Sequence, residues 1–470
     1  MSFVITSNSP VQTVVNPPAR PAWRWLSGCL LAMCYWWSGI GWAGTVGFEG
    51  EEVKAGMGPW DARELARVPE AAWGATNGLV QEVYYQGEPF NGRPTRVFGY
   101  LGRPSGTFPA GRPGMVLVHG GGGKAFKEWA EHWAKRGYVA LAMDLAGNGP
   151  EGRMVDGGPD QSDAVKFRSF TRADVKEMWS YHAVAAVIRG HSLLRSLPDV
   201  DPERVGLTGI SWGGYLTCIV AGLDARFRVA VPVYGCGFLG ENSYWKDKSL
   251  AAMLPEARAL WLRLFDPSQY VGSVRYPMLF VNGTTDFAYP LDSYQRTYRL
   301  VPEKYRQVSV VVNRPHGHIW TFPEVDGFVD QVLNGDKPIV RLGPPEVREG
   351  KLTVLIERGA AVKEASLCYT TNSGAWQQRQ WKTVPARVEG GRVVADIPST
   401  WPLVAFVEVK DESGRPVSSE HVELVVVPAG HGGRGASGGR SSGGVTRLGL
   451  GQGRPGDAVR ELAISTSIGD

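Results

Sequence analysis

The sequence predicts an α/β fold with a doubly wound, mostly parallel sheet, followed by a small all-β sandwich domain. Two observations carry this prediction. Between residues 96 and 333, short apolar runs alternate with stretches of helical periodicity, as in parallel strands covered by helices on both faces. After Lys337 the chain changes to short runs of alternating polar and apolar residues separated by turn signals.

The expected elements of the first part alternate in a regular order. Apolar runs predict strands at residues 96–102, 115–118, 139–143, 205–208, 229–233, 278–281 and 308–312. Helices are expected at residues 124–135, 172–194, 212–221, 290–301 and 323–333. Together these elements predict one domain over residues 44–336, with a lid insertion at about 238–272 where the alternation breaks.

The remaining segments differ in composition from this domain. Residues 337–428 carry six or seven short strand patterns, which predicts a fibronectin-like or immunoglobulin-like sandwich. We favour a spacer or a domain packed on the first one as the role of this region, and carbohydrate binding through Trp376 or Trp381 is the alternative. Residues 429–470 form a tail rich in glycine, serine and arginine, which we expect to be disordered.

A candidate nucleophile directly follows the strand at residues 205–208. The sequence there is Gly209-Ile210-Ser211-Trp212-Gly213, and a helical pattern comes next. A serine on a sharp turn between a strand and a helix needs small residues two positions before and after it, and Gly209 and Gly213 satisfy that need. The pattern therefore favours Ser211 as an exposed nucleophile.

A glycine-rich loop follows the strand at residues 115–118. It reads His119-Gly120-Gly121-Gly122-Gly123, and its backbone N–H groups are free to face a ligand. Acyl transfer needs two fixed donors for the developing oxyanion, and the candidates are Trp212 together with Gly121 or Gly120. A phosphate-binding loop is the alternative, but the lysine or dinucleotide context that such loops carry is missing.

An acid and two histidines follow later strands. Asp286 comes after residues 278–281, although it could also serve as a turn or cap residue. His316 and His318 both follow residues 308–312, and either could be the general base. We favour His316, and His318 stays the alternative base. The chain order serine, aspartate, histidine is that of one type of catalytic triad.

These motifs give the chain a family resemblance. From about Tyr84 to Leu333 it resembles an α/β-hydrolase of the dienelactone hydrolase and acetyl xylan esterase group, with relatives among prolyl oligopeptidase-like hydrolases. The glycine loop, the stretch YVALAMDLAGNG and the stretch NGTTDFAYPLDSY carry most of the likeness. His316 before glycine resembles the ending of dienelactone hydrolases, whereas Gly317-His318 resembles that of many other hydrolases. The resemblance implies ester hydrolysis through a serine acyl-enzyme.

Composition excludes several partners. The formal charge is +4, and no dense lysine or arginine run with interleaved aromatics occurs, so a nucleic acid partner is not expected. No histidine and cysteine cluster has zinc-ligand spacing, and we expect no metal or cofactor. Cys218, Cys236 and Cys368 are odd in number, so a disulfide framework is not expected, although a Cys218–Cys236 bridge stays open.

The amino terminus resembles export machinery. A polar stretch with Arg20 and Arg24 precedes an uncharged apolar run at residues 25–42, and Gly41-Trp42-Ala43 is a small-x-small site. Residues 1–43 are therefore expected to be a signal peptide or an anchor. The protein would be secreted or periplasmic, with membrane contact only if this segment is retained.

The leading interpretation is a secreted serine esterase that releases acetyl or similar groups from polysaccharide. Its substrate would be a small-molecule or polysaccharide ester, with Tyr244 and Trp245 of the lid as candidate pocket residues. The alternatives are a prolyl oligopeptidase-like serine peptidase and a noncatalytic carbohydrate-binding protein on a hydrolase scaffold. The sequence does not indicate the acyl group, the alcohol or the oligomeric state.

Overall fold

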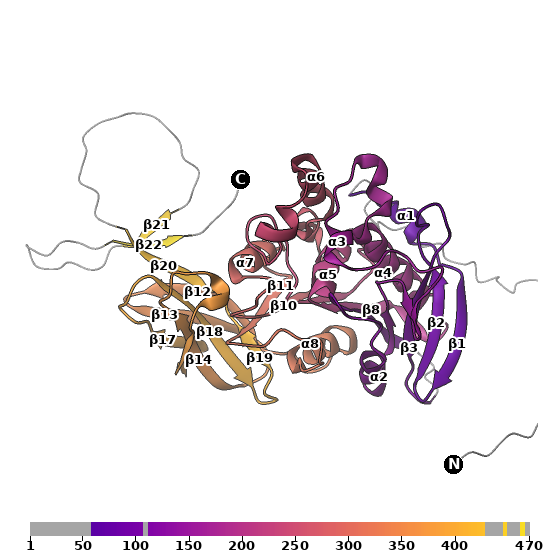
Figure 1. Cartoon of the computed structure of the whole chain (residues 1–470). Helices are drawn as coiled ribbons and strands as arrows, with labels where there is room; N and C mark the ends of the chain where they lie inside the picture. The colour runs from indigo at the N-terminus through magenta and orange to yellow at the C-terminus, as the bar shows by residue number, and fades with distance from the viewer. Residues whose placement is uncertain (1–57, 107–110, 428–444, 449–460, 466–470) are drawn as a thin grey trace, which may run out of the picture. The chain divides into compact units, whose positions relative to one another are not determined.

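The computed structural model describes residues 58–106, 111–427, 445–448 and 461–465. Its centre is a mixed sheet whose first part has the strand order β1-β2-β3-β5-β4-β8-β9-β10-β11 (Figure 1). The bounds of these strands are Ala71–Asn77 for β1, Val80–Gln86 for β2, Arg96–Gly102 for β3, Arg112–Val118 for β4, Val139–Met143 for β5, Val200–Ile210 for β8, Val229–Val233 for β9, Met278–Gly283 for β10 and Arg306–Val311 for β11.

The middle strands are parallel and end at one edge of the sheet. Val118 of β4 pairs with Gly209 of β8, and Ile210 of β8 pairs with Val233 of β9. On the other side of β9, the strands β10 and β11 run in register up to the pair Gly283 and Val311. Loops that follow these strands therefore start close together, which brings distant parts of the sequence to one place.

Helices cover both faces of this sheet. In Figure 1 α2 and α8 lie on one face, and α4, α5 and α7 lie on the other. Side-chain contacts join α2 to α8, as between His132 and Asp326. The helix bounds are Ala62–Leu65 for α1, Lys127–Lys135 for α2, Asp163–Lys166 for α3, Trp179–Arg195 for α4, Trp212–Leu223 for α5, Pro255–Phe265 for α6, Leu291–Arg299 for α7 and Pro323–Asn334 for α8.

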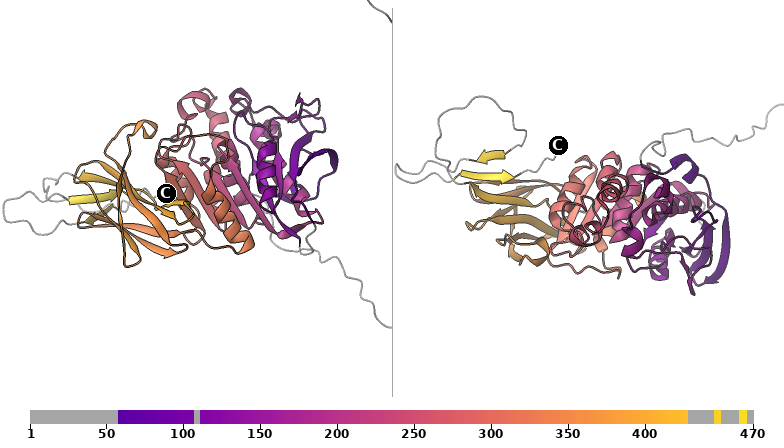
Figure 2. Two further views of the ribbon diagram at one scale, coloured as in Figure 1. Left: turned by 90° about the horizontal axis from the view of Figure 1, so that it is seen from below. Right: turned by 45° about the horizontal axis from the view of Figure 1, so that its top comes forward.

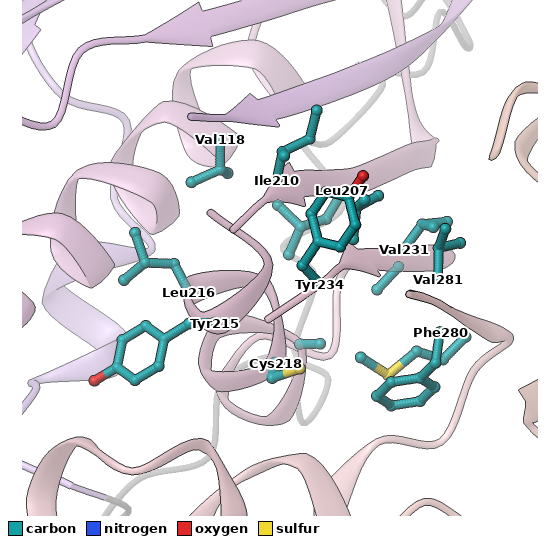
Figure 3. Packing of buried hydrophobic residues seen from close by; sticks show 14 of the residues in the cluster. Val118, Leu207, Ile210, Tyr215, Leu216, Cys218, Val231, Tyr234, Phe280 and Val281 are labelled. Carbon is teal, nitrogen blue, oxygen red and sulfur yellow. The ribbon is translucent and has the colours of Figure 1, made fainter. Parts of the chain in front are cut away.

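The core lies between the parallel strands and their helices. Figure 3 shows side chains of β8, β9, β10 and α5 in one apolar cluster. Leu207, Val231 and Phe280 from three neighbouring strands are fully buried, as are Leu216 and Cys218 of α5. Burial of apolar side chains on both faces is what the uninterrupted apolar runs predict.

Residues 238–272, which the sequence predicts to be a lid insertion, form a mostly helical segment. It contains a short π-helical turn at Lys246–Leu250 and the helix α6, and it ends in short 3₁₀ turns before β10. Trp261 of α6 is fully buried, and its Nε1–H donates to the carbonyl of Lys166 at 3.0 Å. The segment is thus packed against α3.

The C-terminal strands form two sheets. One has the order β12-β13-β17-β16, and the other consists of β14, β15 and β18 to β20. The second is continuous with the central sheet, because β19 pairs antiparallel with β11 through Ser418 and Val308 (Figure 2). The bounds are Arg341–Arg348 for β12, Lys351–Arg358 for β13, Val362–Thr370 for β14, Lys382–Pro385 for β15, Arg387–Glu389 for β16, Arg392–Asp396 for β17, Leu403–Asp411 for β18, Pro416–Ser418 for β19 and Val422–Val427 for β20.

The carbohydrate-binding idea for the two tryptophans of this region is wrong. Trp376 is 6% exposed and Trp381 is 8% exposed. Trp381 packs on Phe406 with ring centroids 5.4 Å apart, and the guanidinium of Arg379 lies 3.6 Å from the Trp376 ring. A sugar-binding platform needs an open ring face, so both side chains are structural.

Three further expectations concern the ends of the chain and the cysteines. The expected signal or anchor at residues 1–43 lies outside the described residues. Within the tail expected to be disordered, the strands β21 (Val445–Leu448) and β22 (Glu461–Ser465) pair with each other, and β22 pairs with β20. Cys218, Cys236 and Cys368 are buried free thiols, so the open Cys218–Cys236 bridge is not formed. None of the helices in the described ranges is both long enough and apolar enough to span a membrane.

Candidate active site

Ser211 lies at the turn between β8 and α5, with an unusual backbone. Its φ of 61° and ψ of −118° fall in a region that side chains other than glycine rarely adopt. The backbone is held in place because the Ser211 N–H donates to Val233 at 2.9 Å and its carbonyl accepts from Tyr215 at 3.0 Å. Ser211 therefore stands at the N-terminus of α5, where the helix dipole favours negative charge.

Glycines make this turn sterically feasible. A Cβ at Gly213 would collide with the carbonyl of Val118, and one at Gly209 would collide with the carbonyl of Gly213. Side chains at either position would push β4, β8 and α5 apart. The spacing of glycines around Ser211 thus has a packing reason as well as a conformational one.

The glycine loop after β4 is fixed by His119. Its Nδ1 contacts the carbonyl of Gly120 at 2.8 Å, and its Nε2 accepts from the N–H of Leu145, also at 2.8 Å. These two bonds assign the proton to Nδ1, and burial lowers the pKa of His119, so its ring is neutral. A Cβ at Gly121 would meet the indole of Trp212 at 2.7 Å, which places the loop directly against the residue after Ser211.

Asp286 is held by backbone donors in the loop after β10. Its Oδ1 accepts from the N–H groups of Ala288 at 2.9 Å and Tyr289 at 2.8 Å. Its side chain is buried, and Oδ2 stays available for a further partner. Asp286 therefore has the turn role that the sequence analysis gave as the alternative, and its second oxygen also contacts a histidine.

That histidine is His316, in the loop after β11. Its Nδ1 lies 2.6 Å from Oδ2 of Asp286. The ring stacks on Tyr234, with centroids 4.3 Å apart, and the Tyr234 hydroxyl donates to Pro315 at 2.8 Å. Since Nδ1–H must donate to the carboxylate, Nε2 is left as the basic nitrogen.

His318 is in a different environment. Its ring lies near Phe126 and Trp129, and the Trp129 Nε1–H donates to its carbonyl at 3.1 Å. Its Nε2 is buried against Gly120 and has no hydrogen-bond partner among the residues that the structure describes. Burial, together with the nearby His119 and His316, lowers the pKa of His318 to about 4. The structure brings Asp286 to His316 and not to His318.

The two predicted pocket residues have different surroundings. Trp245 is 5% exposed and packs on Trp212 with ring centroids 4.5 Å apart, so it is buried. Tyr244 is 41% exposed and contacts Phe287, which is 51% exposed. Phe287 in turn lies 4.8 Å from the His316 ring. Sequence reasoning missed Phe287, although its place directly after the candidate acid was a usable signal.

Comparisons with known proteins find two matching family models and several relatives. The model of the acetyl xylan esterase (AXE1) family matches residues 70–246, and that of the prolyl oligopeptidase family matches residues 166–327. An acetyl esterase, Axe7A, from Xylanibacter ruminicola is 25% identical over 253 residues, which are 49% of this chain and 54% of that protein. An uncharacterized peptidase, YuxL, from Bacillus subtilis is 27% identical over 124 residues, covering 24% of this chain and 18% of that protein.

Among solved structures, an acetyl xylan esterase from Paenibacillus sp. R4 is 19% identical, with a TM-score of 0.46. The match covers 58% of this chain and 92% of that one. The chain spans less than two thirds of the length of each of these two curated relatives. The parallel sheet, the turn at Ser211 and the two family matches together show that the chain is a member of the α/β-hydrolase superfamily.

Proposed function

We propose that this protein is a serine hydrolase that cleaves carboxylic esters through Ser211, His316 and Asp286. The hydrogen bond between Asp286 and His316 is the observation that carries the proposal. It joins the loops of two adjacent strands at the same sheet edge where Ser211 sits on its strained turn. An isolated serine or histidine has many structural roles, but this combination in this chain order matches a catalytic triad.

In this mechanism Ser211 Oγ attacks the ester carbonyl while Nε2 of His316 takes the hydroxyl proton. Asp286 keeps the imidazole in the required tautomer and stabilises its positive charge. When the tetrahedral intermediate collapses, the bond to the alcohol breaks and His316 returns the proton to the departing oxygen. Water then repeats both steps on the acyl-enzyme and releases the acid and free Ser211.

The oxyanion would be held by backbone N–H groups. Trp212 supplies one donor at the N-terminus of α5, and Gly121 or Gly120 supplies the other from the glycine loop. The contact between Gly121 and the Trp212 indole supports this pairing, because it keeps the two segments together.

The substrate proposed is an acetylated polysaccharide or a small acetyl ester. The match to the acetyl xylan esterase (AXE1) family and the likeness to an acetyl esterase support the acetyl group. The exposed ring of Phe287 lies beside His316, and the exposed ring of Tyr244 contacts Phe287, so the two rings offer an apolar face for a sugar ring near the proposed base. Export is proposed from the sequence of residues 1–43 alone.

A peptidase of the prolyl oligopeptidase type is the second candidate. The family match over residues 166–327 favours it, since this range includes the nucleophile, the acid and both histidines. A noncatalytic sugar-binding protein is less well supported, because Trp376 and Trp381 are buried.

The test is a panel of p-nitrophenyl esters, acetylated xylan and Xaa-Pro peptides, assayed with the wild type and Ser211→Ala. We expect hydrolysis of short acyl esters and of acetylated xylan. The substitution should lower kcat by at least about 10⁴-fold with an unchanged melting temperature. Cleavage of the peptides alone would favour the second candidate, and full activity of the variant would rule out a serine mechanism.

A further inference from the structure

Lys166 is a buried cation next to the proposed oxyanion site. Only 2% of its surface is exposed, and its Nζ lies between two indole rings, 5.0 Å from the Trp179 centroid and 4.8 Å from that of Trp212. A buried ammonium is costly unless rings and hydrogen bonds replace its water. Here the Nζ also donates to the carbonyl of Gln161 and lies 3.6 Å from Oδ1 of Asp163.

These partners connect Lys166 to the glycine loop. The side-chain amide of Gln161 donates to the carbonyl of Gly123 at 2.7 Å. Gln161 therefore accepts a hydrogen bond from Lys166 with its backbone carbonyl and donates one from its side chain to the loop that starts at His119. Neither Lys166 nor Gln161 carried a sequence signal, since an isolated lysine in a short helix has no motif.

The same group reaches the lid and the turn at Ser211. Oδ2 of Asp163 accepts from the Trp245 Nε1–H at 3.0 Å. Trp245 packs on Trp212 from one side, while the ammonium of Lys166 also lies over the Trp212 ring. Trp212, whose N–H is a proposed oxyanion donor, is thus held by groups from two other segments.

We propose that Lys166 is a positioning residue of the oxyanion site, which fixes Trp212 and the glycine loop relative to each other and adds positive charge behind them. This role rests on the proposed serine esterase function. The two donor segments follow the adjacent strands β4 and β8, which pair up to Val118 and Gly209, and the contacts of Lys166 add a side-chain connection beyond the end of that pairing. A fixed cation nearby would also stabilise the negative charge that forms on the substrate oxygen.

The charge of Lys166 makes the role testable by pH. The titratable groups that face it are Asp163 on its own helix, Asp160 in the preceding loop and His119 after β4, while α4 and α5 face it with uncharged indoles. Burial lowers the pKa of Lys166 to about 8, although the two aspartates act in the opposite direction. The ammonium is charged below this pH and neutral above it, so the support should weaken as pH rises through about 8.

The experiment compares Lys166→Met, Lys166→Arg and the control Lys135→Met, which changes an exposed lysine of α2, with p-nitrophenyl acetate as the substrate between pH 6 and 10. Lys166→Met keeps the apolar stem and removes the charge. It should lower kcat by about 10–100-fold, less than the loss of a direct oxyanion donor, with KM changed by less than about threefold. The decline of the wild-type kcat near pH 8 should disappear in this variant, and Lys166→Arg should recover part of the activity.

Two outcomes would overturn this role. The first is a folded Lys166→Met with wild-type kcat and an unchanged pH profile. The second, which applies even if that variant does not fold, is a wild-type kcat that stays constant from pH 7 to 9. An inactive Ser211→Ala beside a fully active Lys166→Met would refute Lys166 alone, whereas an active Ser211→Ala would refute the proposed function and this role together.

Discussion

The two halves of the continuous sheet bury their strands in different ways. In the half from β4 to β11, parallel strands are covered by helices on both faces, whereas β14 and β18 to β20 are antiparallel and contact strands of a second sheet. Every candidate catalytic side chain lies in the first half. Parallel strands end at one edge, so their loops meet there, while antiparallel strands deliver successive loops to opposite edges.

The two halves meet at an edge strand of the hydrolase part. Ser418 pairs with Val308, and its hydroxyl accepts from the N–H of Val310 at 2.9 Å. Nearby, Glu420 bridges Arg299 of α7 at 2.9 Å and Arg306 of β11 at 2.7 Å. The C-terminal strands therefore cover an edge that would otherwise present unpaired backbone groups.

Removal of the C-terminal half should have the largest effect. A chain that ends at residue 336 loses the partner of β11 and the apolar contacts around it, so we expect no soluble, active protein. A chain that ends at residue 428 is the matched control and should retain full activity on a small ester. Activity and melting temperature of both chains measure this difference. An active shorter chain would show that the two halves are independent domains.

The two histidines should give the next largest effect. His316→Ala removes the partner of Asp286 and should lower kcat by about 10⁴-fold, because triad members act as a unit. His318→Ala should cost far less, about tenfold. Steady-state kinetics on p-nitrophenyl acetate decide between them. A severe effect of His318→Ala alone would make His318 the base and contradict the proposed geometry.

The sequence predicted the parallel half better than the junction. The predicted strands at 139–143 and 229–233 have the observed bounds, because apolar runs buried on both faces leave a clear pattern. The junction was missed, since Ser418 and Val308 are more than a hundred residues apart and neither carries a motif. The predicted helix at 172–194 is interrupted at Met178, whose backbone is extended.

In the candidate active site, too, the sequence predicted the features that leave a local pattern and did not predict the contacts between distant residues. Ser211, Asp286 and the two histidines follow apolar strands, so the sequence could place them at one edge. It favoured His316 but did not settle the choice against His318, because both follow the same strand and only the contact to Asp286 separates them. It also could not separate packing from binding for Trp245 and Trp376, because large aromatic residues serve equally in both, and the structure shows that both side chains are buried.

Acid sensitivity should be the smallest effect, and it should arise in the parallel half. Burial lowers the pKa of His191 to about 4, even though its Nδ1 lies 2.9 Å from Asp224. In the unfolded chain the His191 imidazole becomes protonated as the pH falls through about 6.5, whereas in the folded chain it stays neutral down to about pH 4. The free energy of unfolding is therefore unaffected by this group above pH 6.5 and decreases as the pH falls from there towards 4. This titration should lower the free energy of unfolding by about 1–3 kcal/mol at acidic pH.

The variant His191→Asn keeps a hydrogen-bond donor near the position of Nδ1 and removes this titration. Its melting temperature should therefore fall less between pH 7 and pH 4.5 than that of the wild type. Equal pH dependence of the two proteins would show that His191 does not contribute.

The most direct test of the proposed site is covalent labelling of the nucleophile. The wild type is treated with a fluorophosphonate, which reacts with activated serines, and the labelled peptide is identified by mass spectrometry. We predict one adduct, on Ser211, formed in parallel with the loss of esterase activity and greatly slowed by His316→Ala. Loss of activity without modification of Ser211, or labelling at another residue, would contradict the assignment of Ser211 as the nucleophile.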